Sequence, residues 1–209
     1  MKLYYAETLN PRKACAVAKY LNSPVEFAYV QLTKGEHKQP GYLALNPNGK
    51  VPTLAISDGL SIWEADAIMA YLARFAGSDL LPEDDRQIEI MRWLSWNAQH
   101  FTRAASGLYF QYCIKPWIGL GEPDEAAVQD SINQWRPFAA VLNNHLSGKK
   151  YLLGDQLSIA DFSVAVTLPY AKNARIPLSE FPNVARWHER MNELPAWRDP
   201  FPIPDALAA

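Results

Sequence analysis

The residues best suited to bind a small polar ligand lie between positions 46 and 68. A loop ends at Val51-Pro52, immediately before a short strand-like segment. A cis peptide before Pro52 could turn the backbone edge outward, and such an edge can pair with the backbone of a short peptide. Glu64 and Ala65 follow at the expected start of a helix, where free N–H groups and the helix dipole favour an anion. The pattern predicts a tripeptide site, with the ligand carboxylate on the helix N–H groups and its amine on Glu64.

A purely structural interpretation of the same residues is also open on spacing alone. In that interpretation Glu64 only complements the dipole of the helix that follows it. Pro52 then only starts a strand. The residue types by themselves do not separate a binding site from a well-formed loop and helix start.

The cysteines and histidines argue against two other kinds of site. Cys15 and Cys113 are the only cysteines, which is too few for a disulfide framework and the wrong spacing for a metal site. No pair of histidines has the spacing of ligands on one helix face. The histidines are His37, His100, His145 and His188. We therefore expect no metal and, by default, a reducing cytoplasmic environment.

The elements that must position the candidate site form a β-α-β unit, a loop and a β-β-α unit. Asn10-Pro11 opens the first helix, because Asn suits the N-cap and Pro suits the first helical position. A β-α-β unit implies a parallel strand pair, and the Ser57-Asp58-Gly59 turn implies an antiparallel hairpin. The expected strands span residues 3–6, 25–30, 51–56 and 60–63, and the second helix spans 64–75.

The chain changes character after residue 76. Residues 77–86 are polar, contain Gly and Pro, and are expected to be a linker. From residue 87 to 209 the aromatic and apolar residues recur at helical spacing, which predicts an all-helical bundle. The expected helices span residues 88–112 (as one helix or two), 122–146, 158–170 and 181–194.

Composition limits the classes of partner. The 209 residues are 49% apolar and 20% charged, which is normal for a globular protein with a sizeable core. The formal net charge is −2, so no broad field attracts nucleic acid or an anionic membrane. The chain has no basic leader before an apolar stretch and no apolar run near the roughly 20 residues needed to span a bilayer. We expect a cytoplasmic protein that binds neither nucleic acid nor membrane.

The order and spacing of several short motifs resemble the glutathione S-transferase superfamily over nearly the whole chain. The match is especially close to the phi class. In the helical part, Ser158-Ile159-Ala160-Asp161 resembles the internal capping box of that family. The other motifs are His37-Lys38-Gln39-Pro40, Leu43-Ala44-Leu45-Asn46-Pro47, Trp93-Leu94, Gln99-His100-Phe101 and Lys115-Pro116. The resemblance implies a thioredoxin-like domain at residues 1–76 and an all-helical domain at 87–209.

The resemblance also assigns a glutathione site. His37, Lys38 and Lys50 would line it. Val51 would offer its backbone to the cysteinyl part of glutathione, next to Pro52. The two lysines also fit an interpretation as ordinary solvated loop residues.

The glutamyl end of the ligand falls by resemblance on Glu64. The family normally has Ser directly after this residue, and here Ala65 takes its place. The backbone N–H is kept and the hydroxyl is missing, which removes a hydrogen bond with a net contribution of roughly 0.5–1.5 kcal/mol.

Catalysis in this family means stabilising the glutathione thiolate, because a free thiol with a pKa of about 8.5 is mostly protonated at neutral pH. The position that resembles the activating serine of the phi class is Asn10. Its amide can donate to sulfur while the helix start adds positive potential. Thr8 carries a real hydroxyl and Arg12 could add charge. Asn10 is equally consistent with a helix opening that does no chemistry, and Cys15 is expected to be a small buried residue.

The electrophile site of such an enzyme is apolar. The candidates from the helical part are Trp93, Trp96, Asn97, Phe101, Tyr109 and Trp117, and the foremost of them are Trp93, Asn97, Phe101 and Tyr109. The implied function is attack of the glutathione thiolate on hydrophobic electrophiles by a homodimeric transferase. Two alternatives are a glutathione-dependent reductase of peroxides or disulfides and a non-catalytic interaction module of the same fold.

Overall fold

The computed structural model describes residues 1–57 and 59–202, and the chain divides into two compact units. The first unit contains Met1–Leu81 together with the segment that begins at Leu194, and the second contains Pro82–Glu193. The sequence predicts different boundaries, with one domain at residues 1–76, a linker at 77–86 and a second domain at 87–209, and these domain boundaries stay a prediction. The division adds that residues 194–202 group with the first unit, although they lie in the expected helical region.

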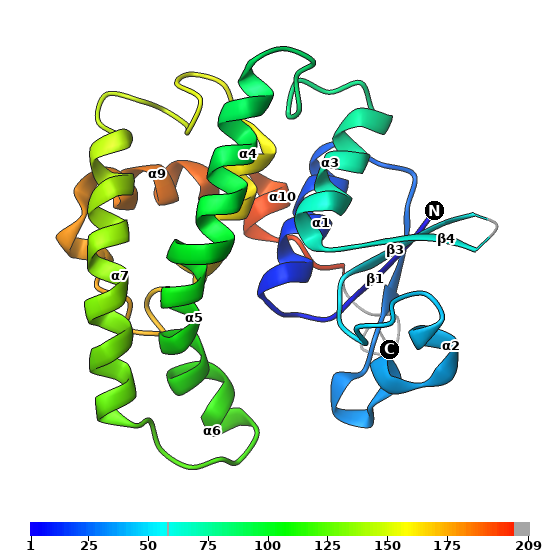
Figure 1. Cartoon of the computed structure of the whole chain (residues 1–209), viewed down its shortest axis with the longest axis horizontal. Coiled ribbons are helices and arrows are strands. Elements are labelled where there is room, and N and C mark those ends of the chain that lie inside the picture. Colours follow the sequence, from blue (N-terminus) through cyan, green and yellow to red (C-terminus); the bar gives the residue numbers. More distant parts are fainter. Residues whose placement is uncertain (58, 203–209) are drawn as a thin grey trace. The chain divides into compact units, whose positions relative to one another are not determined.

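A four-stranded mixed sheet is the centre of the first unit. The strands are β1 (Lys2–Tyr5), β2 (Glu26–Tyr29), β3 (Thr53–Ser57) and β4 (Leu60–Trp63). Their order is β2-β1-β3-β4, with β1 parallel to β2 and the other two pairs antiparallel (Figure 1). The predicted β-α-β unit and the predicted antiparallel pair are thus both present.

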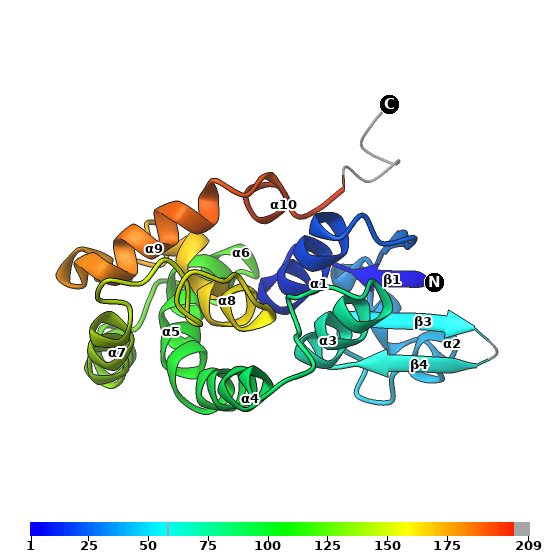
Figure 2. The same ribbon diagram turned by 90° about the horizontal axis from the view of Figure 1, so that it is seen from above.

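Two helices pack against this sheet and against each other. They are α1 (Leu9–Tyr20) and α3 (Ala65–Phe75), which lie side by side in both views (Figures 1 and 2). Leu3 and Leu54 face each other in the β1–β3 register and are fully buried. The next residue, Tyr4, points to the opposite side of the sheet and contacts Tyr42 edge-on at a ring distance of 5.7 Å. Tyr42 belongs to the short helix α2 (Pro40–Leu43), which therefore packs on that second face.

The start of α1 differs from the expectation. Thr8 is the N-cap, with the extended backbone angles of a cap, and its carbonyl accepts the Arg12 N–H at 3.2 Å. Asn10 is therefore inside the first turn, and Pro11 is the third helical residue. Pro is tolerated there because the first N–H groups of a helix have no intrahelical acceptor.

The segment 194–202, which we call the C-terminal strap, belongs to the first unit and contains the short helix α10 (Pro195–Arg198). Lys19 Nζ donates to the carbonyls of Asp199 at 2.8 Å and Phe201 at 3.1 Å. The Tyr5 hydroxyl donates to the Pro202 carbonyl at 3.2 Å. These contacts, with those of Arg12 described below, explain why the strap groups with the sheet unit and not with the helices that precede it.

The second unit is all-helical, as expected. Its segments form one continuous helical run from residue 86 to 117, followed by shorter and longer helices. Within the run, α4 (Arg86–Trp96), α5 (Thr102–Tyr109) and α6 (Lys115–Trp117) are separated by π-helical segments at Asn97–Phe101 and Phe110–Ile114. The remaining helices are α7 (Glu125–His145), α8 (Ile159–Val164), 3-10 turns at Ala165–Tyr170 and Leu178–Glu180, and α9 (Pro182–Asn192).

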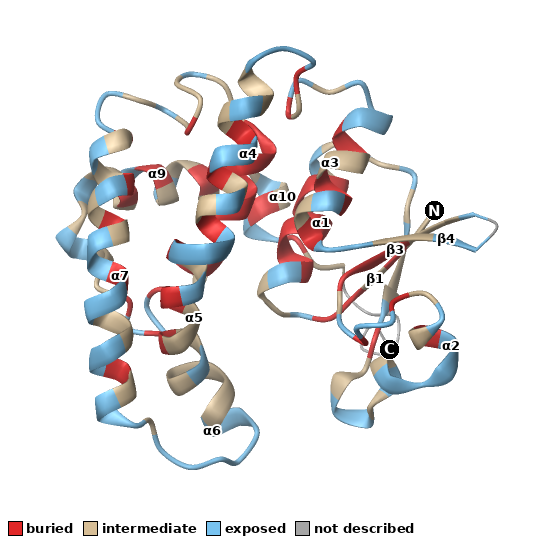
Figure 3. Cartoon of the chain, viewed as in Figure 1, coloured by how far each residue is buried: buried red, intermediate tan, exposed pale blue. Residues whose placement is uncertain are grey.

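In each unit, the buried residues lie mainly on the helix faces that point to other elements of that unit (Figure 3). In the second unit, α8 is buried throughout, and the predicted capping box at its start is present. In that box, Asp161 Oδ2 accepts the Ser158 N–H at 2.9 Å. Across the described helices, none combines the length and the apolar composition that crossing a bilayer requires.

Candidate functional site

The loop before β3 is held by two buried polar side chains. Asn46 is 2% exposed, and its Nδ2 donates to the Lys50 carbonyl at 2.8 Å and to Thr53 Oγ1 at 3.1 Å. Its Oδ1 accepts the Asn48 N–H at 3.0 Å. From α2, the Tyr42 hydroxyl donates to the same Lys50 carbonyl at 2.7 Å. The loop is thus fixed from inside, which leaves the next residues with one defined backbone direction.

Those next residues are Val51 and Pro52, and the peptide bond between them is cis, as predicted. Pairing of β3 with β1 begins at Thr53, which lies opposite Tyr4. The amide and carbonyl of Val51 therefore lie beyond the last strand pair. Pro52 is buried and Val51 is half-buried, so the backbone of Val51 forms a partly accessible edge.

The sheet register brings this edge next to the start of α3. Thr53 lies opposite Trp63 in the antiparallel β3–β4 pair. Val51 and Pro52 precede Thr53 along the chain, and Glu64 and Ala65 follow Trp63, so both pairs of residues lie at this end of the β3–β4 pair. The peptide-pairing edge and the proposed anion site, which are two separate motifs in the sequence, therefore share one end of the sheet.

Glu64 has an unusual backbone conformation. Its φ is +69° and its ψ is 118°, and it is the N-cap of α3. A positive φ in a non-glycine residue costs of order 1–3 kcal/mol, and such residues concentrate at binding and catalytic sites. The Glu64 side chain is exposed and makes no capping bond to the helix. The structure therefore gives Glu64 a strained backbone and an available carboxylate beside the first N–H groups of an eleven-residue helix.

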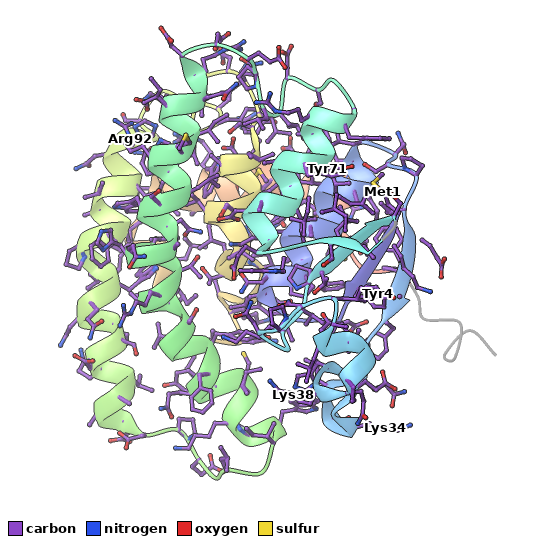
Figure 4. The ribbon with its side chains drawn as sticks, turned by 45° about the vertical axis from the view of Figure 1, so that its right-hand side comes forward. Met1, Tyr4, Lys34, Lys38, Tyr71 and Arg92 are labelled. Carbon is purple, nitrogen blue, oxygen red and sulfur yellow. The ribbon has the colours of Figure 1, made fainter. Side chains whose placement is uncertain are left out.

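The predicted basic residues of the loop are distributed around Gly49. Lys38, labelled beside α2 in Figure 4, donates from Nζ to the Gly49 carbonyl at 3.1 Å. Gly49 has φ +56°, and a Cβ there would come within 2.9 Å of both the His37 carbonyl and Lys38 Nζ. His37 is half-buried, and within the described part of the chain its enclosed Nδ1 has no hydrogen-bond partner. Lys50 is exposed.

The three candidates for thiol activation have different environments. Thr8 is half-buried and its hydroxyl makes no capping bond, whereas Asn10 is exposed. Arg12 is 7% exposed, and its Nη2 donates to the Trp197 carbonyl at 2.7 Å. Its guanidinium therefore binds the C-terminal strap, and the expectation that Arg12 supplies charge to the sulfur stays a prediction. Cys15 is fully buried, and burial raises the pKa of its thiol to about 12, so it is inert as expected.

Three of the six predicted electrophile-site residues belong to the core of the second unit. Trp93 is 4% exposed, and Asn97 and Phe101 are fully buried. Asn97 Nδ2 donates to the Ser163 carbonyl at 3.0 Å, which explains its burial. These three residues are thus structural, and the expectation that they line a ligand site is wrong. Tyr109 remains half-buried, packs edge-on against Tyr170, and has its pKa raised by burial.

A set of exposed apolar residues lies just beyond Tyr109, and sequence reasoning named only Trp117 among them. One of them opens the second π-helical segment and the others follow it, and turns of this kind occur often at functional sites. They are Phe110, Trp117, Ile118 and Leu120, with exposed fractions of 40, 66, 47 and 60%. The sequence shows several large apolar residues in close succession here. Helical periodicity alone does not show which of them face outward.

The fold and this site define a class: a thioredoxin-like sheet with an edge before a cis-proline, joined in sequence to an all-helical unit. Profiles of two protein families match the chain. The glutathione S-transferase N-terminal domain matches residues 1–74, and the glutathione S-transferase C-terminal domain matches residues 98–195. The chain therefore belongs to the glutathione S-transferase family, and the resemblance predicted from its motifs is confirmed.

Individual relatives agree with this assignment. The chain is 36% identical to glutathione S-transferase 3 of Zea mays over 220 residues, with 98% of this chain and 97% of that protein covered. It is 29% identical to glutathione S-transferase GstB of Escherichia coli (strain K12), with 93% and 94% covered. Its fold is similar to that of glutathione S-transferase III in apo form, with a TM-score of 0.84, 33% identity and coverage of 97% and 98%.

A further solved structure has a ligand named with it. Glutathione S-transferase I bound with lactoylglutathione has a TM-score of 0.87, 29% identity and coverage of 95% and 97%.

Among residues 1–57 and 59–202, no group of three or more His, Cys, Asp or Glu side chains is placed to hold a metal ion.

Proposed function

We propose that this glutathione S-transferase binds glutathione across the end of the sheet where Val51 faces the start of α3. The observation that carries the proposal is the β3–β4 register, whose pair of Thr53 with Trp63 brings the Val51 edge and the start of α3 to the same end of the sheet. The cysteinyl backbone of glutathione pairs with Val51, and its γ-glutamyl group binds Glu64 and the helix N–H groups. His37, Lys38 and Lys50 surround the glycyl end. The similar structure that holds lactoylglutathione supports glutathione as the cosubstrate.

The thiolate of the bound glutathione attacks a hydrophobic electrophile. The exposed apolar set that follows Tyr109, in the second unit, supports an apolar cosubstrate. Each unit also has large exposed apolar residues on a helix, which supports a homodimer. They are Phe75 in the first unit, and Ile88 and Met91 in the second. Two free cysteine thiols support a reducing, cytoplasmic environment.

Binding and turnover can be tested separately. Titration with glutathione should change the tryptophan fluorescence of the protein and give a saturable dissociation constant. Mixing the protein with glutathione and chlorodinitrobenzene should then form the thioether at a rate proportional to enzyme concentration. Absence of binding at millimolar glutathione contradicts the proposal as a whole. Binding without thioether formation, but with reduction of an organic peroxide or a mixed disulfide, would reassign the reaction to the reductase alternative.

Thr8 and Asn10 differ in what they can give the sulfur, and single variants separate them. We expect Thr8→Val to lower kcat about tenfold to a hundredfold with little change in the glutathione dissociation constant, because a bond to the thiolate matters most in the reacting state. Asn10→Ala should have a smaller effect, since its side chain is exposed to water. Steady-state kinetics with varied glutathione measures both. The reverse ranking would assign the sulfur contact to Asn10.

Ala65→Ser should improve the site. Ala65 is 5% exposed and stands at the first helical position of α3, where a hydroxyl can reach a bound carboxylate. The added hydrogen bond is worth roughly 0.5–1.5 kcal/mol, so we expect glutathione to bind about two to ten times more tightly. Fluorescence titration measures the change. Unchanged or weaker binding would place the γ-glutamyl carboxylate away from this turn.

A further inference from the structure

Two consecutive cations, Arg12 and Lys13, are buried in the first turns of α1. Their exposed fractions are 7% and 5%. Arg and Lys are almost never buried to this extent unless they are paired, because removing a charge from water is costly. Their positions in the helix send the two side chains in different directions, and each one reaches a different neighbour in the first unit.

Lys13 connects the start of α1 to the start of α3. Its Nζ lies 3.2 Å from Asp66 Oδ1, with side-chain exposed fractions of 7% for Lys13 and 25% for Asp66. Asp66 directly follows Glu64 and Ala65 and lies in the first turn of α3. The ion pair is thus largely removed from water. In such a pair a defined geometry counts for more than in an exposed pair.

Arg12 connects the same turn of α1 to the C-terminal strap. Besides the bond to the Trp197 carbonyl, its Nη2 donates to the Arg198 carbonyl at 3.3 Å, and the guanidinium lies 5.0 Å from the centre of the Trp197 ring. Its backbone N–H donates to the Thr8 carbonyl. Arg12 therefore binds the strap with its side chain and, with its backbone N–H, holds Thr8, the residue proposed to contact the sulfur.

We propose that Arg12 and Lys13 are positioning residues that fix the sulfur-binding turn of α1 relative to the γ-glutamyl-binding turn of α3. This inference rests on the proposed function, because it assigns the two turns to the thiol and the γ-glutamyl group of one ligand. Neither side chain touches the ligand. Lys13 sets the separation of the two turns through Asp66, and Arg12 stops the first turn of α1 from moving away by holding it to the strap.

A fixed separation matters for the reaction more than for binding. The γ-glutamyl and glycyl ends of the tripeptide can still be held if the turn of α1 shifts slightly. The thiolate, however, needs its donor at hydrogen-bond distance, and a displacement of about 1 Å can cost about a hundredfold in rate. Loss of the ion pair should therefore lower turnover and raise the pKa of the bound thiol, with a smaller change in affinity.

The test uses Lys13→Met, Asp66→Asn and the double variant of the full-length protein. We expect each single variant to lower kcat/KM for chlorodinitrobenzene about tenfold and to move the thiol ionisation in the pH profile up by about one unit. The dissociation constant for S-methylglutathione, which has no free thiol, should change less than about threefold. The double variant should be no worse than either single one, because both remove the same link.

Matched variants separate positioning from general destabilisation. Lys2→Met removes an ion pair of the same unit, Lys2–Glu26 at 2.7 Å, which is largely exposed and lies between β1 and β2. It should leave the pH profile unchanged. Lys13→Arg keeps the charge and should restore most of the activity. Thermal unfolding of every variant shows whether the lost activity exceeds the fraction unfolded at the assay temperature.

Two results would overturn the inference. One is a double variant whose loss equals the product of the two single losses; the other is a thiol ionisation that stays at the wild-type pH in both single variants. In either case a wild-type protein that binds glutathione and forms the thioether keeps the proposed function intact. If the wild-type protein itself does not bind glutathione, the proposed function fails first, and the unfolding curves alone would then report on the ion pair.

Discussion

Replacing Glu64 by alanine should weaken glutathione binding about a hundredfold or more, so that immobilised glutathione no longer retains the protein. A carboxylate that binds an ammonium group contributes a charge-assisted hydrogen bond, and a loss of about 3 kcal/mol corresponds to this change in the dissociation constant. Glu64→Gln keeps the size and removes the charge, so its affinity should lie between the two. Fluorescence titration gives all three constants.

The backbone of Glu64 provides a control that separates binding from folding. At φ +69°, glycine relieves a strain of about 1–3 kcal/mol and adds an entropic cost of roughly 0.5–1 kcal/mol, so Glu64→Gly should be at least as stable as the wild type while abolishing retention. Asn22 also has a positive φ, +48°, and lies in the turn after α1. Asn tolerates the left-handed region well, so Asn22→Gly should change stability little and keep full glutathione affinity. Retention of Glu64→Gly on the glutathione matrix would contradict the assignment of the carboxylate.

Much of the sheet unit was predictable, because local signals and long-range geometry agree there. Alternating and apolar segments define the strands within one or two residues. The sequence marks Pro52 as a position where a cis peptide could occur, and the structure has one there. No spacing in the sequence, however, predicts that Val51 and Glu64 lie close together. Their proximity comes from the β3–β4 register, which depends on pairings that no local pattern contains.

Three features escaped sequence reasoning for identifiable physical reasons. Asn-Pro is such a strong helix opening that it concealed Thr8, which caps the helix two residues earlier. An aromatic stripe at helical spacing fits a core and a ligand site equally well, so Trp93 was misassigned. The contact of Arg12 with Trp197 joins residues 185 positions apart, and no periodicity connects them.

The largest effect on stability should come from Asp161→Ala. The Asp161 carboxylate accepts hydrogen bonds from the Leu152 and Ser158 N–H groups, the Ser158 hydroxyl and the Trp187 indole N–H, at 2.9 to 3.1 Å. Alanine leaves these four buried donors without an acceptor, and each orphaned donor costs about 1–3 kcal/mol. Relaxation and water entry recover part of that, so we expect a loss of about 3–5 kcal/mol in the free energy of unfolding, measured by urea denaturation near neutral pH.

The protonation of Asp161 adds a pH dependence that the variant lacks. Burial raises the pKa of this carboxyl to about 6, against the hydrogen bonds that lower it, whereas an unfolded Asp titrates near its ordinary value of 3.8. The folded state thus binds the proton more tightly, and its stability falls as pH rises from about 4 to about 6. The difference in unfolding free energy between the wild type and Asp161→Asn, which does not titrate, should shrink over that window by up to about 3 kcal/mol. Parallel pH curves for the two proteins would mean that the capping bonds outweigh the burial and that Asp161 stays ionised throughout.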